Sequence, residues 1–234
     1  MDLTLLVEEV GRHLAAGNRH PAHACSAMRR LVRSSALTAH VRSALGSSKE
    51  IRRMSEKSQV HPNAFDKVTL FQTSLGVKLV LHRWLAADDA ADDSIHNHRW
   101  DFCSAVLGGM LLCEEYVERP DGTVRAYAHE YRSPGDTAEY SLTSLGGSRV
   151  ALVGRITHGV GAVYHQAHDV LHRARVSSSG ALTLIVQGPV LADSTAVHSS
   201  SLRPAAHRVL RREPGEVAHA LTDLLHTLPV PPGS

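Results

Sequence analysis

The chain has 234 residues, of which 43% are hydrophobic and 21% charged, and its formal net charge is +2. This length allows one sizeable domain with appendages, and the composition is typical of an ordinary globular protein rather than a disordered or fibrous one. The small net charge argues against a nucleic-acid binder, and no apolar run approaches the ~20 residues that a membrane-spanning helix needs.

The cysteine content and the first residues favour the cytoplasm. The chain has only three cysteines, and an odd number cannot all be paired, so we expect no disulfide framework. The opening stretch MDLTLLVEEVGRHL has two glutamates and no basic n-region, so we expect no secretory signal and no membrane partner. Eight Lys or Arg fall between Met28 and Lys57, but no aromatic residue is interleaved for base stacking. We therefore interpret them as a solvated helical face and expect no nucleic-acid partner.

The first 60 residues have the periodicity of helices. Apolar residues recur at three- and four-residue steps in the first stretch, which gives one apolar stripe: Leu3, Leu6, Val7, Val10 and Leu14. A second helical stretch, HACSAMRRLVRSSALTAHVRSAL, follows Pro21, and Gly46 ends or interrupts it. We predict that residues 1–60 form a helical segment packed on the rest of the chain.

Residues 61–196 have the pattern of strands. KVTLFQTS and VKLVLHRWLA are β-rich runs on either side of Leu75-Gly76, which predicts a hairpin. Further runs follow in SIHNHRWDFCSAVLGGMLLCEEY, TVRAYAHEYR, SRVALVGRIT, GAVYHQAHDVLHRARV and ALTLIVQGPV. Many short strands with no helix between them predict an antiparallel sandwich or barrel. In the tail, residues 197–234, the pattern predicts one more helix around EPGEVAHALTDLLHTL.

His96 and His98 are candidate metal ligands. In a strand, alternate side chains share a face, so both imidazoles would point the same way and supply two ligands of a facial metal site. The chain contains 17 histidines, however, so a chance pair is a serious alternative. A third ligand from elsewhere in the chain is needed to decide between the two.

These histidines resemble the first motif of the cupin superfamily, in which two histidines one residue apart precede a glutamate and a glycine. Here His96, His98 and Gly109 match, while Phe102 stands where the glutamate would be. His172 matches the single histidine of the second cupin motif. The resemblance implies a mainly β fold, a cupin jelly-roll barrel with N-terminal helices and a short C-terminal helix. It also implies a metal held by His96, His98 and His172.

Within the cupins, the region from Phe65 to Pro189 looks most like the cysteine dioxygenase group. The matching segments are FDKVTLFQTSLGVKLVLHRW, SIHNHRWDFCSAVLGG, VLHRARV and TLIVQGP. That group also lacks the glutamate and holds Fe(II) with three histidines. Thiol dioxygenases carry a serine–histidine–tyrosine trio where this chain has Thr183, Ile185 and Gln187. The resemblance therefore supports the fold and the metal but not a thiol substrate.

Several other residues are candidates for the site. Asp101 is an alternative carboxylate ligand, although on a regular strand it would face away from the histidines and would need a bulge to turn inward. His61 and His82 are interpreted as structural. We predict catalytic roles for His168, as a proton carrier, and for Tyr164. The predicted substrate-binding residues are Lys67, Arg83 and Trp100. By the resemblance, Lys67 occupies the position of the arginine that binds the substrate carboxylate in the cysteine dioxygenase group.

The sequence thus predicts a mononuclear non-haem Fe(II) cupin oxygenase, a dioxygenase-like oxidoreductase. Its partners would be O2 and a small polar metabolite, anionic or amino-acid-like. Zn, Mn or Ni in the same site is an alternative, and would make the protein an isomerase, lyase or decarboxylase. A non-catalytic ligand-binding cupin is a third alternative. The resemblance also allows a homodimer.

Overall fold

Helices precede and follow a large β-sheet. The computed structural model describes residues 2–15, 20–61, 63, 65–85, 94–132, 139–200, 206–208 and 210–229. In these ranges the helices are α1 (Leu3–Arg12), α2 (Pro21–Val32), α3 (Ser35–Leu45), α4 (Ser48–Ser55) and, after the sheet, α5 (Pro214–Thr227). None of these helices is both long and apolar enough to cross a bilayer.

Side-chain caps set where the N-terminal helices begin. Asp2 caps α1 by accepting a hydrogen bond from the backbone N–H of Thr4 at 2.8 Å. The stretch predicted as one second helix is in fact two, α2 and α3, with a break at Arg33-Ser34. The Ser34 hydroxyl accepts from the backbone N–H of Leu37 at 3.2 Å, so this serine starts a new helix.

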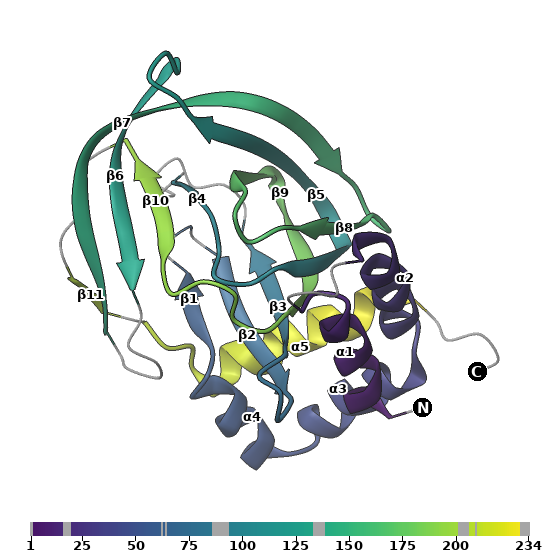
Figure 1. Ribbon diagram of the computed structural model, residues 1–234. Helices are drawn as coiled ribbons and strands as arrows, with labels where there is room; N and C mark the ends of the chain where they lie inside the picture. The colour runs from purple at the N-terminus through teal and green to yellow at the C-terminus, as the bar shows by residue number, and fades with distance from the viewer. Residues whose placement is uncertain are drawn as a thin grey trace.

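All strand pairings between described residues are antiparallel. The strands are β1 (Gln59–His61), β2 (Phe65–Gln72), β3 (Lys78–Trp84), β4 (Ile95–His96), β5 (Phe102–Glu118), β6 (Val124–Arg132), β7 (Glu139–His158), β8 (Val163–Gln166), β9 (Leu171–Gln187), β10 (Thr195–Ser199) and β11 (Ala206–Arg208). The sheet runs β9-β4-β10-β6-β7-β5, and β5 pairs again with β9. This last pairing closes the strands into a barrel, whose curvature Figure 1 shows.

The predicted fold class is confirmed: the molecule is mainly antiparallel β, with helices before it and one helix after it, as in a cupin jelly roll. The strand predicted for the two histidines is shorter than expected, since β4 contains only Ile95 and His96. Strand β10 pairs with β4 and β6 as far as Ser199, beyond the predicted limit of the barrel at residue 196. The domain boundaries at residues 60 and 196 stay predictions.

The register between β9 and β5 shifts at the middle of β9, so the two halves of β9 pair with different parts of the barrel. Residues 171–176 pair with the second half of β5, and residues 181–187 pair with its first half and with β3. At this shift, Gly109 and Gly180 both have positive φ, at 70° and 71°. A Cβ on Gly109 would lie 2.2 Å from the carbonyl oxygen of Gly180, so the strands meet this closely only because residue 109 is glycine.

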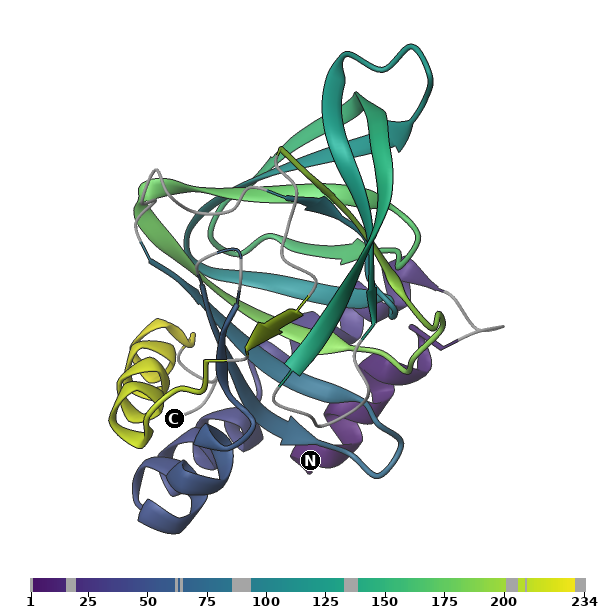
Figure 2. The same ribbon diagram turned by 90° about the vertical axis from the view of Figure 1, so that its left-hand side faces the viewer.

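The main hydrophobic core lies between the helices and the outer face of the barrel. Fully buried residues of α1, α2 and α5, such as Val10, Leu31 and Leu221, belong to one cluster with Leu81 of β3 and Leu184 of β9. Figure 2 shows the helices gathered on one side of the barrel. Strand side chains alternate, so the neighbours of these core residues point into the barrel.

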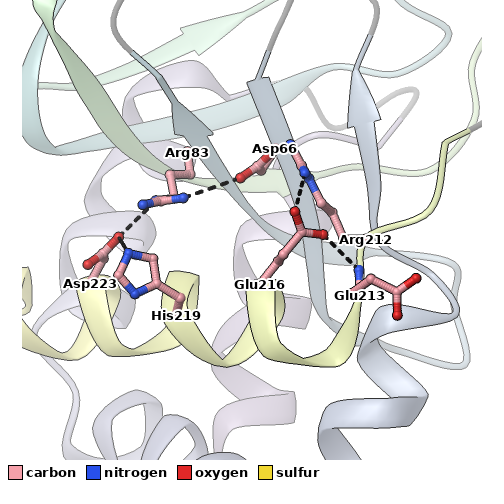
Figure 3. A network of polar contacts seen from close by, with 7 residues as sticks. All are labelled: Asp66, Arg83, Arg212, Glu213, Glu216, His219 and Asp223. Carbon is pink, nitrogen blue, oxygen red and sulfur yellow. Dashed lines mark hydrogen bonds and ion pairs between the residues drawn. The ribbon is translucent and has the colours of Figure 1, made fainter.

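A polar network fastens α5 to the barrel, as Figure 3 shows. Asp66 of β2 is only 3% exposed and contacts two guanidinium groups, those of Arg83 and Arg212. Arg83 also donates to Asp223 of α5 at 2.8 Å, and Arg212 pairs with Glu216 in the first turn of α5. The helix is thereby tied to a buried carboxylate near both its ends.

Candidate metal centre

Strand pairing brings three histidines together. His96 at the end of β4 lies directly opposite His172 of β9 in the antiparallel register. His98 follows two residues later, in an irregular stretch whose backbone N–H donates to the carbonyl of His168 at 2.9 Å. One nitrogen from each imidazole falls in a group whose members all lie within 4.8 Å of one another. Among the described residues, this is the only such group of histidine, cysteine and carboxylate side chains.

Backbone hydrogen bonds fix the tautomers of two of these rings. Nδ1 of His96 lies 3.1 Å from the carbonyl of Ser94, and Nδ1 of His172 lies 3.1 Å from the carbonyl of Val170. Because a carbonyl only accepts, each Nδ1 must carry the proton and donate. Each neutral ring therefore keeps an unprotonated Nε2 for a ligand, an arrangement typical of metal-binding histidine.

Burial keeps all three imidazoles neutral. Desolvation is the main cause that lowers the pKa of His96, lowers that of His98 well below its ordinary value, and lowers that of His172 to about 3. Each further protonation is opposed by the neighbouring histidines, which act on the pKa of His98 and His172. Metal ligation requires neutral imidazole, so the three rings are in the protonation state that a metal ion needs.

The spacing of the nitrogens suits one divalent ion. Nε2 of His98 and Nε2 of His172 lie 3.3 Å apart. Two nitrogens bound at about 2.1 Å to one ion, at right or tetrahedral angles, lie about 3.0 to 3.4 Å apart. The Phe102 ring stands 5.1 Å from the His98 ring, centroid to centroid, where the first cupin motif has its glutamate. The donor set is therefore three imidazoles with an apolar neighbour.

Asp101 and His168 lie together beside this group and not in it. Asp101 is fully buried, and its carboxylate accepts from both the backbone N–H and Nδ1 of His168, each at 2.8 Å. His165 lies 3.4 Å from the other carboxylate oxygen. Asp101 thus holds the segment of His168, whose carbonyl in turn holds the backbone of His98. His168 is not among the residues lining the cavity, and its catalytic role stays a prediction.

The histidines open onto a cavity of about 190 Å³ inside the barrel. The sheet register places one row of inward side chains across its wall: His61 of β1 opposite Phe65 of β2, which is opposite Trp84 of β3. A second row runs beside it: Gln59, Lys67, His82 and Thr183. Thr183, Ile185 and Gln187 stand where thiol dioxygenases have their serine–histidine–tyrosine trio, and Ile185 and Gln187 also line the cavity.

Of the predicted catalytic and substrate-binding residues, three line this cavity (Lys67, Trp100 and Tyr164) and two do not (Arg83 and His168). Lys67 reaches over the Trp100 ring, with Nζ 5.5 Å from the centroid. Tyr164 stacks on His158 at a centroid distance of 4.1 Å, and burial raises the pKa of its hydroxyl, which stays protonated. Arg83 instead faces outward to Asp66 and Asp223, because it alternates with the inward neighbours His82 and Trp84. The predicted roles of these residues in substrate binding and catalysis stay predictions.

A buried carboxylate paired with two arginines lies behind the strand that carries His172. Arg173, the next residue, donates to Glu114 of β5 at 2.9 Å, and Arg155 of β7 donates to the same carboxylate at 3.0 Å. Although burial raises it, these hydrogen bonds lower the pKa of Glu114 to about 2. The network joins β5, β7 and β9 on the side of β9 away from the cavity.

The sequence reasoning missed His61, His82 and Trp84 as cavity residues. The signal that could have found them is strand parity: Lys67 was expected in the site, and His82 is its cross-strand partner, with Trp84 two residues further on. Alternation along β3 predicts which of its side chains face the cavity only when the register between β2 and β3 is known.

No family model matches this chain, and a comparison with curated proteins finds no relative. Similar solved structures include hydroxypropylphosphonic acid epoxidase from S. wedmorenis in complex with fosfomycin, at 10% identity and a TM-score of 0.33 over 53% of this chain and 50% of that one. A hydroquinone 1,2-dioxygenase in complex with Cd²⁺ and 4-hydroxybenzonitrile has 15% identity and a TM-score of 0.32, over 60% of this chain and 72% of that one. DMSP lyases have 11% identity and a TM-score of 0.31, over 62% and 52%. The chain spans about half the length of the epoxidase, and similarities this low assign it no activity, substrate or metal.

Proposed function

We propose that this protein is a mononuclear non-haem Fe(II) oxygenase that acts on a small anionic metabolite. The observation that carries the proposal is the convergence of His96, His98 and His172 at the cavity, with two of the rings held by backbone carbonyls. A three-imidazole set leaves positions open for substrate and dioxygen. The resemblance to the cysteine dioxygenase group supports iron as the metal.

The chain's own residues would divide the remaining work. When bound, Fe(II) would supply the redox chemistry that activates dioxygen. Lys67 would hold an anionic group of the substrate, and the Trp100 ring beneath it would fix the position of the ammonium. Tyr164 keeps its proton, its hydroxyl interacts with Cys113 and Ser104, and its ring would contact a ligand in the cavity. The contacts of His168 with Asp101 and His98 support a positioning role for that residue.

The same donor set favours one second candidate. Three neutral imidazoles also suit Zn(II), and such a centre would act as a Lewis acid in an isomerisation, elimination or decarboxylation. The absence of a carboxylate from the group, within the described residues, is the observation that keeps this candidate open.

Metal content and spectroscopy separate the two. The purified protein is assayed for metals by mass spectrometry, reconstituted anaerobically with Fe(II), and exposed to nitric oxide while electron spin resonance is recorded. We expect one Fe(II) per chain, an iron–nitrosyl signal, and oxygen uptake with a member of a panel of small carboxylates. Loss of one ligand in His96→Ala should weaken metal binding at least about 100-fold.

The matched control is His219→Ala, because the His219 side chain is 61% exposed on α5, far from the three-histidine group. This variant should bind metal as the wild type does. Stoichiometric zinc with no oxygen uptake across the panel would support the Lewis-acid candidate instead. If His96→Ala and His172→Ala bind Fe(II) as tightly as the wild type, the proposed centre is wrong.

A further inference from the structure

The cavity wall contains hydrogen-bonding nitrogens that the protein itself leaves unused. Nε1 of Trp84, Nε1 of Trp100 and Nε2 of His82 are buried and, within the part of the chain that the structure describes, have no hydrogen-bond partner. All three residues line the cavity. An indole N–H can only donate, and a buried donor without an acceptor is destabilising. These donors are therefore available to acceptor atoms of a bound molecule.

The charge of the wall has one sign. Lys67 lines the cavity, and the three histidines, like any imidazole side chains, bring no negative charge to it. Among the described residues that line the cavity, none is an aspartate or a glutamate. A positively charged ligand group, such as the ammonium of an amino acid, would find no ionic partner there. A single carboxylate would match the single lysine.

Aromatic rings form a large part of the remaining wall, beside polar side chains such as Gln59 and Gln187. Phe65 and Trp84 pack at a centroid distance of 4.2 Å, and Phe102, Tyr131 and Tyr164 also line the cavity. Aromatic walls favour a planar ligand body, which can stack or pack edge to face. The volume of about 190 Å³ accommodates a body of about one ring.

We propose that the cavity selects a small aromatic monocarboxylate, with the Lys67 ammonium supplying the charge and the indole N–H groups of Trp84 and Trp100 supplying hydrogen bonds to acceptor atoms. His82 contributes a further polar contact on the same wall. The inference deepens the proposed function by naming its substrate class, and it rests on that function only in treating this cavity as the substrate site.

Calorimetric titration with probes of matched shape tests the selection. Benzoate, neutral benzamide and cationic benzamidine share one ring and a planar head, and propionate keeps the carboxylate without the ring. We expect benzoate to bind at least about 10-fold more tightly than benzamide or propionate, and benzamidine not to bind. Equal or tighter binding of benzamide or benzamidine would overturn the inference, and so would tighter binding of phenylphosphonate.

Variants assign the selection to named atoms. Lys67→Met should lower benzoate affinity about 10- to 100-fold and leave benzamide unchanged, whereas Lys67→Arg should keep the preference for benzoate. Trp84→Phe removes the indole N–H and keeps an aromatic ring, so it should weaken benzoate binding less than Lys67→Met does. Lys49→Met, an exposed lysine on α4, is the control and should bind as the wild type does. Circular dichroism checks folding, and benzoate selectivity that survives in a folded Lys67→Met variant contradicts the proposal.

Each titration is done on metal-free protein and on Zn(II)-loaded protein. Selective benzoate binding by a chain that takes up neither Fe(II) nor Zn(II) would support this inference and defeat the proposed function. A bound metal with no selectivity among the probes would do the reverse.

Discussion

At the residue scale, the most consequential feature is that the metal-binding candidates are held by main-chain atoms. The carbonyls of Ser94 and Val170 orient His96 and His172, and both carbonyls lie two residues before the ring that they hold. Such contacts depend on local backbone conformation and not on a partner side chain. The third ring, that of His98, is positioned through the backbone of the His168 segment, and Asp101 holds that segment. Preorganisation of this kind favours a defined coordination geometry.

The prediction at this scale concerns Glu114. Its carboxylate is 2% exposed and binds Arg173 and Arg155, so Glu114→Gln leaves two guanidinium groups without their anion. We expect a loss of about 2–3 kcal/mol in the free energy of unfolding, below the ~3–5 kcal/mol of a fully buried pair, because the Arg155 side chain is 58% exposed. Denaturant unfolding of the variant measures the loss. Glu50→Gln, in the exposed pair with Arg53, should lose less than about 1 kcal/mol.

The pKa of Glu114 also predicts how stability depends on pH. The pKa of Glu114 is lowered from its ordinary value of 4.5 to about 2, so the folded state binds this proton less readily than the unfolded state does. The stabilisation is therefore fully present above about pH 4.5 and is lost as the pH falls toward 2. The stability difference between wild type and Glu114→Gln should shrink across this window. A difference that stays constant from pH 5 to pH 2.5 would show that the carboxylate does not act through its charge.

At the element scale, α5 is held by a network whose members differ in burial. The apolar α5 residues Val217, Leu221 and Leu224 are fully buried. Burial of these side chains contributes most of the free energy that holds α5 against the barrel. The polar contacts above them set the position of the helix, since Asp66 binds both Arg83 and Arg212 (Figure 3). Sequence periodicity could predict the helix, but not a carboxylate partner nearly 150 residues away.

The prediction at this scale compares two carboxylates of the network. Asp66→Asn removes the charge between two partly buried guanidinium groups, and we expect it to lower the free energy of unfolding by about 2–4 kcal/mol. Asp223→Asn should cost less than about 1 kcal/mol, because the Asp223 side chain is 36% exposed to solvent. Urea unfolding of both variants gives the comparison. Equal losses would mean that burial does not decide the strength of these ion pairs.

At the scale of the whole molecule, helices and barrel share one hydrophobic core. Residues from α1 to α5 and from β2, β3, β5 and β9 belong to the same buried cluster. A helical segment that shares its core with the sheet cannot unfold alone without exposing apolar strand residues. We therefore expect the first 60 residues to unfold together with the barrel.

Two probes test this expectation. Both tryptophans, Trp84 and Trp100, lie at the barrel cavity, so their fluorescence reports on the barrel, while circular dichroism at the helix band reports mainly on α1–α5. The two unfolding curves in urea should coincide, with one midpoint. A separate helix transition at lower urea would show that the N-terminal segment is an independent unit.

By itself the sequence determined the features that are local or periodic. Strand alternation indicated the antiparallel β class, the apolar stripe from Leu3 to Leu14 indicated α1, and the resemblance of the segments around His96, His98 and His172 to the cupin motifs indicated the metal-binding candidates. Only the tertiary structure decided what depends on register and on contacts between distant segments. It turned Arg83 out to Asp66, turned Lys67 and Trp84 in toward the cavity, and left the indole nitrogens there without hydrogen-bond partners among the described residues. The physical reason is that a one-residue shift between β2 and β3 would exchange the two faces, and the pattern of each strand alone does not fix that shift.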